Sequence, residues 1–153
     1  MKNLVLLVLV CSLSSASLVS AQSKQTQKEM FEGVYNTSKE TVKSEQFEFV
    51  ANVVFKGKKR ESFKDNSNQI IINKNKVFGE LETFSTDKTR YVFNDDNSKI
   101  SASFDDENQD ISITIQTKNN VISIEVKPNG NAFLMLSGNR SGDISYRGTL
   151  LKL

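Results

Sequence analysis

The sequence predicts an all-β fold: an antiparallel meander of about eight short strands, forming a barrel-like or sandwich domain with one N-terminal helix packed outside it. Three observations lead there. Apolar and polar residues alternate with a period of two from residue 47 onward, and turn-forming residues separate the runs. The 153 residues include ten phenylalanines and one proline, and β-branched and aromatic side chains suit a pleated, half-buried surface. This periodicity fits a barrel and a sandwich equally well.

Residues 1–21 have the three parts of a secretory signal peptide. Lys2 gives a positive start, Leu4 to Val10 is an unbroken apolar run, and Val19 to Ala21 ends in small residues. The apolar core is much shorter than the ~20 residues of a transmembrane helix, and no later segment is long enough either. We therefore expect cleavage after Ala21, export to the periplasm or the extracellular space, and no transmembrane span.

Cys11 offers an alternative, because a cysteine in a leader can be the lipid-modified residue of a bacterial lipoprotein. That processing favours a small residue before the cysteine, and Val10 stands there. We favour ordinary cleavage after Ala21 and keep a lipid anchor at Cys11 as the alternative. Ordinary cleavage removes the only cysteine of the chain.

Residues 22–46 form a polar N-terminal segment with helical signals. Met30, Phe31, Val34 and Tyr35 fall on one stripe of a helix. The Thr37 to Glu40 spacing is that of a capping box, which predicts a second short helical stretch. We expect this segment to pack against the outside of the sheet or over one end of it.

Residues 47–153 form the β domain, and its first half contains four predicted strands. Phe47 to Phe55 alternates, yet it carries apolar residues on both faces, so we expect both faces to be covered. Gln69 to Asn73 and Val77 to Leu81 flank Lys74-Asn75, a two-residue hairpin site. Arg90 to Phe93 is a fourth, weaker strand.

The second half alternates more clearly. The expected strands are Ile100 to Phe104, Ile111 to Ile115, Ile122 to Val126, Ala132 to Leu136 and Ile144 to Leu150, with turns at Asn119-Asn120 and Pro128 to Gly130. Their inward rows place Ile113, Ile124, Leu134 and Tyr146 in the core. Phe133 and Met135 point to the opposite face, where we expect the N-terminal helix to cover them.

A family resemblance rests on the first strand, Phe47-Glu48-Phe49-Val50-Ala51, and on the ending Asn139-Arg140-Ser141 followed by Ile144-Ser145-Tyr146-Arg147-Gly148. From about Lys39 to Leu153 the chain resembles the bacterial exported family called domain of unknown function 4251. Similar members carry a Leu-Pro-Tyr-Phe-Gly segment, for which this chain has only Val77-Phe78-Gly79. The resemblance implies an envelope setting and a compact β domain, and it implies no activity.

Composition argues against several chemistries. The chain has no histidine, so Ser-His-Asp triads, Cys-His pairs and the usual zinc shells are not available to the mature protein. The net charge of +2 argues against a dedicated nucleic-acid binder, whose domain carries a clear basic excess. We expect that the protein binds no cofactor and is not an enzyme. A carboxylate-based hydrolase is kept as the most distant alternative.

The candidate binding residues are few. Lys58, Lys59 and Arg60 form one basic cluster, which either meets anionic glycan or lipid head groups or blocks pairing at a strand end. Arg140 and Tyr146 stand in the most recognisable segment, where they form a site at the barrel end or serve a structural role. The acidic loop Asp105 to Asp110 is either a calcium site or a solvated hairpin tip, and its order lacks the EF-hand pattern.

The predicted function is that of a non-catalytic exported β domain of the cell envelope that binds an unknown envelope component. One alternative is a barrel that carries an apolar small molecule, since small barrels are either packed solid or hold one ligand. The sequence leaves the oligomeric state open.

The processing prediction is testable by intact-mass measurement of the protein purified from its own host. We expect a mass that corresponds to a chain starting at Gln22, because the residues at Val19 to Ala21 suit the cleaving peptidase. A mass that fits a lipid-bearing chain starting at Cys11 would contradict the prediction.

Overall fold

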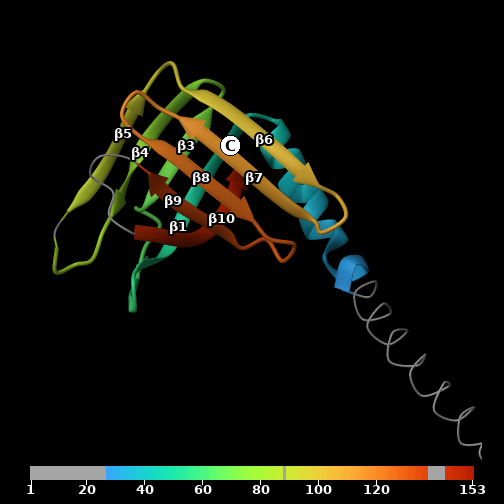
Figure 1. Ribbon diagram of the computed structural model, residues 1–153, viewed down its shortest axis with the longest axis horizontal. Helices are drawn as coiled ribbons and strands as arrows, with labels where there is room; N and C mark the ends of the chain where they lie inside the picture. The colour runs from blue at the N-terminus through green and yellow to red at the C-terminus, as the bar shows by residue number, and fades with distance from the viewer. Residues whose placement is uncertain (1–26, 88, 138–143) are drawn as a thin grey trace, which may run out of the picture.

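In the computed structural model, which describes residues 27–87, 89–137 and 144–153, one antiparallel sheet and one helix share a single core. The helix covers residues 27–43. The ten strands of the described residues are β1 (Gln46–Lys56), β2 (Lys59–Ser62), β3 (Gln69–Asn73), β4 (Lys76–Glu82), β5 (Arg90–Asp95), β6 (Lys99–Asp105), β7 (Asp110–Gln116), β8 (Val121–Val126), β9 (Ala132–Ser137) and β10 (Ile144–Lys152) (Figure 1). The predicted all-β class with one N-terminal helix is confirmed.

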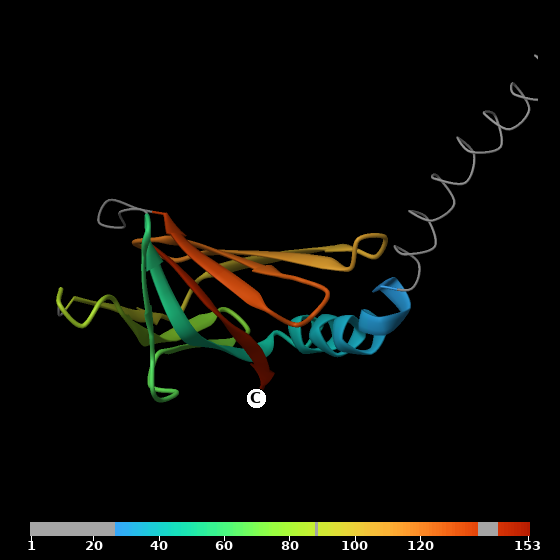
Figure 2. The ribbon, with the colours of Figure 1, turned by 90° about the horizontal axis from the view of Figure 1, so that it is seen from below.

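The sheet is a curled half-barrel. Its strand order is β5-β4-β3-β1-β10-β9-β8-β7-β6, with β2 attached to β1 alone. One wall carries β3, β4 and β5, and the facing wall carries β6 to β9 (Figure 2). The paired strands β1 and β10 join the two walls, while β5 and β6 remain as the free edges. Of the two predicted forms, barrel-like and sandwich, the structure therefore has the barrel-like one, as a half-barrel with two free edges.

The inward rows of both walls fill the space between them. Ile113, Ile124, Leu134 and Tyr146 are all at most 1% exposed, which confirms the predicted register of the second half. Phe47 and Phe49 join the same cluster from β1, and Ile72 joins it from β3 in the other wall. Burial of this apolar surface is the main favourable term in folding, because the described residues contain no disulfide that could replace it.

β1 departs from simple alternation. Its pairing register with β10 shifts between Ala51 and Val53, which is a β-bulge. Phe47, Phe49 and Ala51 belong to the core cluster, and beyond the bulge Val54 takes the next core position. Val50 and Val53 are buried as well, outside that cluster. The extra residue exchanges the residues that point inward with those that point outward. The sequence pattern could not predict this exchange, because both faces of the strand are apolar.

Gly148 on β10 lies beside this bulge. A Cβ atom at this position would come within 2.0 Å of the Val50 carbonyl oxygen, so only glycine lets the β1 backbone approach so closely. The curl of the sheet at the β1–β10 junction thus depends on a bulge in one strand and a glycine in the other.

The helix differs from its predicted form and place. It is continuous through Thr37, whose hydroxyl donates a hydrogen bond to the Gly33 carbonyl at 2.9 Å and caps no second helix. Tyr35 and Val42 are buried in the main core, whereas Met30 is 67% exposed. The helix therefore lies across the half-barrel from β6 and β7 and closes part of the main core (Figure 2).

The expected cover over the outer face of β9 is accordingly wrong. Met135 is 45% exposed and Phe133 is only partly buried. The buried apolar residues of the helix are Tyr35 and Val42, seven residues apart, and Phe31 is partly buried. This stripe turns toward the inward rows because these offer more apolar surface.

The strand register can be tested with two neighbouring substitutions on β8. Ile124→Ala removes a side chain that is 1% exposed, and we expect it to lower the free energy of unfolding by about 2–5 kcal/mol through lost transfer energy and a residual cavity. Ser123→Ala, on the opposite face, is the control and should change little. Thermal or denaturant unfolding of both variants measures the difference, and a reversed ranking would place this strand one residue out of register.

Candidate functional site

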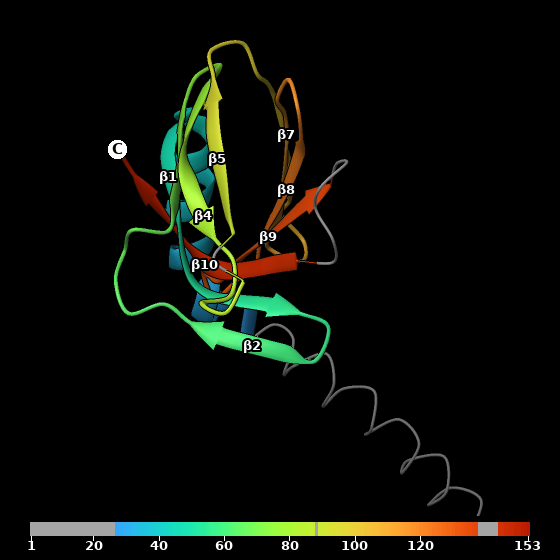
Figure 3. The ribbon, with the colours of Figure 1, turned by 90° about the vertical axis from the view of Figure 1, so that its left-hand side faces the viewer.

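The β1–β2 hairpin projects from the half-barrel and carries the basic cluster. β2 pairs only with the end of β1, so this short ribbon stands away from the rest of the sheet (Figure 3). Gly57 occupies the turn with a φ of 59°, a conformation that glycine adopts without strain. The sequence did not predict β2, because its residues, Lys59–Ser62, contain no apolar side chain that would mark an inward row.

Lys58, Lys59 and Arg60 are exposed on this hairpin. Among the described residues, none of the three lies within ion-pair distance of a carboxylate. The adjacent acid, Glu61, instead accepts hydrogen bonds from the Ser85 backbone N–H at 3.2 and 3.3 Å. The three charges therefore face solvent.

Like charges stand opposite each other at the end of the ribbon. Lys56 on β1 pairs in register with Lys59 on β2, and like charges directly across a strand pair repel. Asp87 lies 3.7 Å from the Lys56 ammonium and attracts it. This ion pair offsets only part of the repulsion, because both side chains are about half exposed and water screens their charges. This ribbon, in which β2 pairs with no described strand other than β1, carries four cations within the five residues 56–60, which is a local concentration of positive charge.

The two other predicted residues separate. Arg140 lies outside the described residues. Tyr146 is fully buried on β10, so it offers no surface for a ligand from solvent. Burial raises the pKa of its phenol, and the nearby Tyr91 adds to the rise. The Tyr146 hydroxyl has no hydrogen-bond partner within the described part of the chain, so it does not tie a described loop backbone as a structural role would require.

The acidic loop between β6 and β7 fastens the N-terminal helix. Asp106 accepts hydrogen bonds from the Tyr35 hydroxyl and from the Lys39 ammonium, the latter at 2.5 Å. Gln109, which is 3% exposed, donates to the Lys28 carbonyl at 3.0 Å. The loop thus holds the helix in its first turn, through Lys28, and again at Tyr35 and Lys39. Sequence reasoning missed this contact, because residues 35 and 106 lie far apart in the chain.

The same loop shows how its carboxylates are used. Asp105 accepts hydrogen bonds from the Asn108 side-chain amide at 2.8 Å and from the backbone N–H groups of Asn108 and Glu107 at 3.0 Å. These bonds lower its pKa, with the Asn108 side chain as the largest cause. The described residues contain no group of three or more acidic, His or Cys side chains that could hold a metal ion. Asp95, the last residue of β5, likewise accepts hydrogen bonds from the backbone N–H groups of Asn97 and Lys118 at 2.8 and 2.5 Å.

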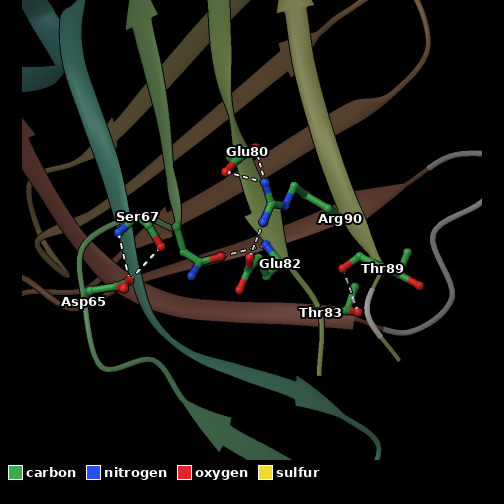
Figure 4. A network of polar contacts seen from close by, with 8 residues as sticks. Asp65, Ser67, Glu80, Glu82, Thr83, Thr89 and Arg90 are labelled. Atoms are coloured by element: carbon green, nitrogen blue, oxygen red, sulfur yellow. Dashed lines mark hydrogen bonds and ion pairs between the residues drawn. The ribbon is translucent and has the colours of Figure 1, made fainter. Parts of the chain in front are cut away.

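Paired carboxylates occur on β4, and they serve an ion pair. Glu80 and Glu82 both bind the Arg90 guanidinium of β5, at 2.9 and 2.5 Å (Figure 4). These bonds raise the pKa of Arg90, with the Glu82 hydrogen bond as the largest cause. Glu82 and Thr83 also line a surface pocket of about 270 Å³ at this rim. The guanidinium occupies the space between the two carboxylates that an acid–base pair leaves for a substrate.

The interior of the half-barrel contains side chains. Phe49, Ile70, Ile115 and Leu134 are each 0% exposed and belong to one cluster. A second surface pocket, of about 230 Å³, lies between residues 92–97 and 117–120. The described side chains thus meet across the interior, and the pockets that they line open at the rim and on the surface.

Comparison with known proteins supports the fold. No family model matches the sequence, and no curated protein sequence matches it. The chain resembles the crystal structure of a DUF4251 family protein from Bacteroides eggerthii with a TM-score of 0.59 and 17% sequence identity, over 77% of this chain and 87% of that chain. The predicted resemblance to domain of unknown function 4251 is therefore confirmed as a likeness of fold. The neighbour's description states no activity.

The hydrogen bonds from Tyr35 and Lys39 to Asp106, which we call the Asp106 latch, predict that the stability of the fold depends on pH. Hydrogen bonds from Lys39 and then Tyr35 lower the pKa of Asp106, so its ionised form stabilises the folded chain above the ordinary Asp pKa of about 3.9. We expect Asp106→Asn to melt at a lower temperature than the parent at neutral pH. The gap should close as the pH falls through the lowered pKa of the folded state, because Asp106 is then protonated in both states.

Glu107→Gln is the control, since Glu107 is an exposed acid of the same loop. Melting temperatures from circular dichroism, recorded from about pH 7 down to about pH 3, give both curves. A gap between Asp106→Asn and the parent that persists unchanged at the acid end would show that the carboxylate charge does not fasten the helix.

The buried hydroxyl of Tyr146 predicts a stabilising substitution. Tyr146→Phe removes a buried hydroxyl that has no described partner, and an unsatisfied buried polar group costs about 1–3 kcal/mol. We expect an unchanged or higher free energy of unfolding in denaturant titrations. Tyr35→Phe is the matched control, because its hydroxyl binds Asp106 and its removal should destabilise the chain. Destabilisation by Tyr146→Phe would mean that this hydroxyl has a partner in the folded protein.

Proposed function

We propose that this protein is a non-catalytic exported domain that attaches to an anionic component of the cell envelope through the β1–β2 hairpin. One observation carries the proposal. Three consecutive cations, Lys58, Lys59 and Arg60, are exposed on a projecting ribbon, and no described carboxylate pairs with them. The signal-peptide pattern of residues 1–21 supports the setting, since an exported domain meets the envelope first.

The energetics of the ribbon favour a binding role over a purely structural one. Lys56 and Lys59 repel each other across the strand pair, and β2 adds no residue to the buried apolar core. The ribbon therefore contributes little to stability in the isolated chain. An anionic surface would relieve the repulsion, because each cation then gains a counter-charge.

The shape of the hairpin indicates the class of ligand. A ribbon tip has no cleft that could enclose a small molecule, but it fits a surface on which negative groups repeat. Lys offers a point charge and Arg a planar fork, and both bind phosphate oxygens. Phosphate-bearing lipid head groups and acidic glycans share this chemistry, and the net charge of only +2 confines the attraction to the hairpin.

Vesicle co-sedimentation tests the proposal. Residues 22–153 should bind vesicles that contain anionic phospholipid and leave neutral vesicles unbound, with binding that weakens as salt rises. Each Lys or Arg near an anionic surface contributes about 1 kcal/mol. The triple variant Lys58→Gln, Lys59→Gln, Arg60→Gln should therefore bind on the order of a hundredfold more weakly.

The matched control is the triple variant Lys28→Gln, Lys118→Gln, Lys152→Gln, which removes the same charge from exposed positions on other elements. It should bind nearly as well as the parent. Competition with a soluble acidic polysaccharide distinguishes a glycan ligand from a lipid one. The polysaccharide should release the protein from the vesicles if the hairpin prefers glycan, and the protein should stay bound if it prefers lipid. Equal losses in the two triple variants, or binding to neither ligand, would refute the proposal.

A further inference from the structure

The half-barrel leaves β6 as a free edge with an unpaired row of backbone N–H and C=O groups. β6 pairs with β7 on one side, and in the strand order of the described residues it has no neighbour on the other (Figure 1). Ser101, Ala102 and Ser103 in its centre are exposed. An edge of this kind is a template for another strand.

β6 also lacks the features that normally blunt an edge. Its register with β7 runs without a bulge from Lys99 to Asp105, and the strand contains neither proline nor glycine. The five residues between its charged ends, Ile100 to Phe104, are all uncharged. Natural edges usually place a lysine, a proline or a bulge in such a stretch.

The sequence of β6 is complementary to itself in the antiparallel direction. A two-fold axis perpendicular to the strand at Ala102 sets Lys99 opposite Asp105 of a second copy, and Ile100 opposite Phe104 of that copy. Ser101 then faces Ser103, and Ala102 faces its own counterpart. Opposite charges across a strand pair stabilise it. The Asp105 carboxylate, which accepts hydrogen bonds within its own turn, would thus attract Lys99 of the second copy at each end of the contact.

The other free edge does not have this property. In β5 the charged ends are Arg90 and Asp95, an odd number of residues apart. A two-fold axis keeps each side chain on its own face of the sheet, so it can pair only residues whose separation is even. Arg90 therefore never faces Asp95 of a second copy, and it is already bound by Glu80 and Glu82.

We propose that two copies of this chain associate edge to edge through β6, in the antiparallel register centred on Ala102, to form one continuous sheet. Such a contact is isologous and closes after two copies. It pairs the free backbone groups of both edges, and it covers Ile100 and Phe104, which are only partly buried against the core in a single copy. The occupant of the edge is thus a second copy rather than an unrelated extended peptide.

The axis at Ala102 provides a sharp test. Ala102→Lys and Ala102→Glu each place two like charges against each other across the axis, and the exposure of Ala102 lets a single chain accept either side chain. By sedimentation velocity we expect the parent to be a dimer and each variant alone to dimerise about a hundredfold more weakly. An equimolar mixture of the two variants should recover the dimer, because lysine then faces glutamate.

Ser112→Lys on the neighbouring strand β7 is the control, since it adds the same charge one strand away from the edge and should leave the dimer intact. Circular dichroism verifies that each variant is folded, and recovery in the mixture excludes misfolding as the cause of dissociation. A monomeric parent, a dimeric Ala102→Lys variant, or a mixture that stays monomeric would each overturn the proposal.

Discussion

The pairing of β1 with β10 is the constraint on which the rest of the structure depends. It joins the first and the last strand of the sheet from Phe47 opposite Lys152 to Lys56 opposite Ile144. β3 to β5 attach to the sheet through β1, and β6 to β9 attach through β10. Without the junction, each wall would expose its inward apolar residues to water. Only the closed junction brings the two rows into one core.

This junction also determines the order of assembly. Its partners are separated by most of the chain, so the entropy of closing a long loop must be overcome before the contacts form. The two meanders, by contrast, consist of neighbouring strands joined by short turns. We infer that each meander forms locally and that the β1–β10 pairing completes the fold, with the bulge near Ala51 and Gly148 giving the curl.

The helix and the acidic loop act together on the open side of the half-barrel. Tyr35 contributes both an apolar ring to the core and a hydroxyl to Asp106. Burial and the Asp106 carboxylate raise the pKa of Tyr35 to about 12, so the phenol stays protonated and remains a donor. Within the described residues, apolar side chains of the helix and the strands form one core between the walls. The β1–β2 hairpin and the β6 edge both lie outside that core. The described helix is also too short or too polar to span a membrane.

The sequence by itself determined the β class, the positions of nine strands and the inward rows of the second half, because alternation with a period of two reports which face is buried. It also singled out Lys58, Lys59 and Arg60, since charge is visible in the chain. The tertiary structure decided the rest. The bulge in β1 changes which residues of the strand face the core, and both faces of this strand are apolar. The helix packs against the main core and leaves Met135 exposed, because the inward rows offer more apolar surface. The Asp106 latch and the free edge at β6 arise from contacts between distant segments, which no local pattern encodes.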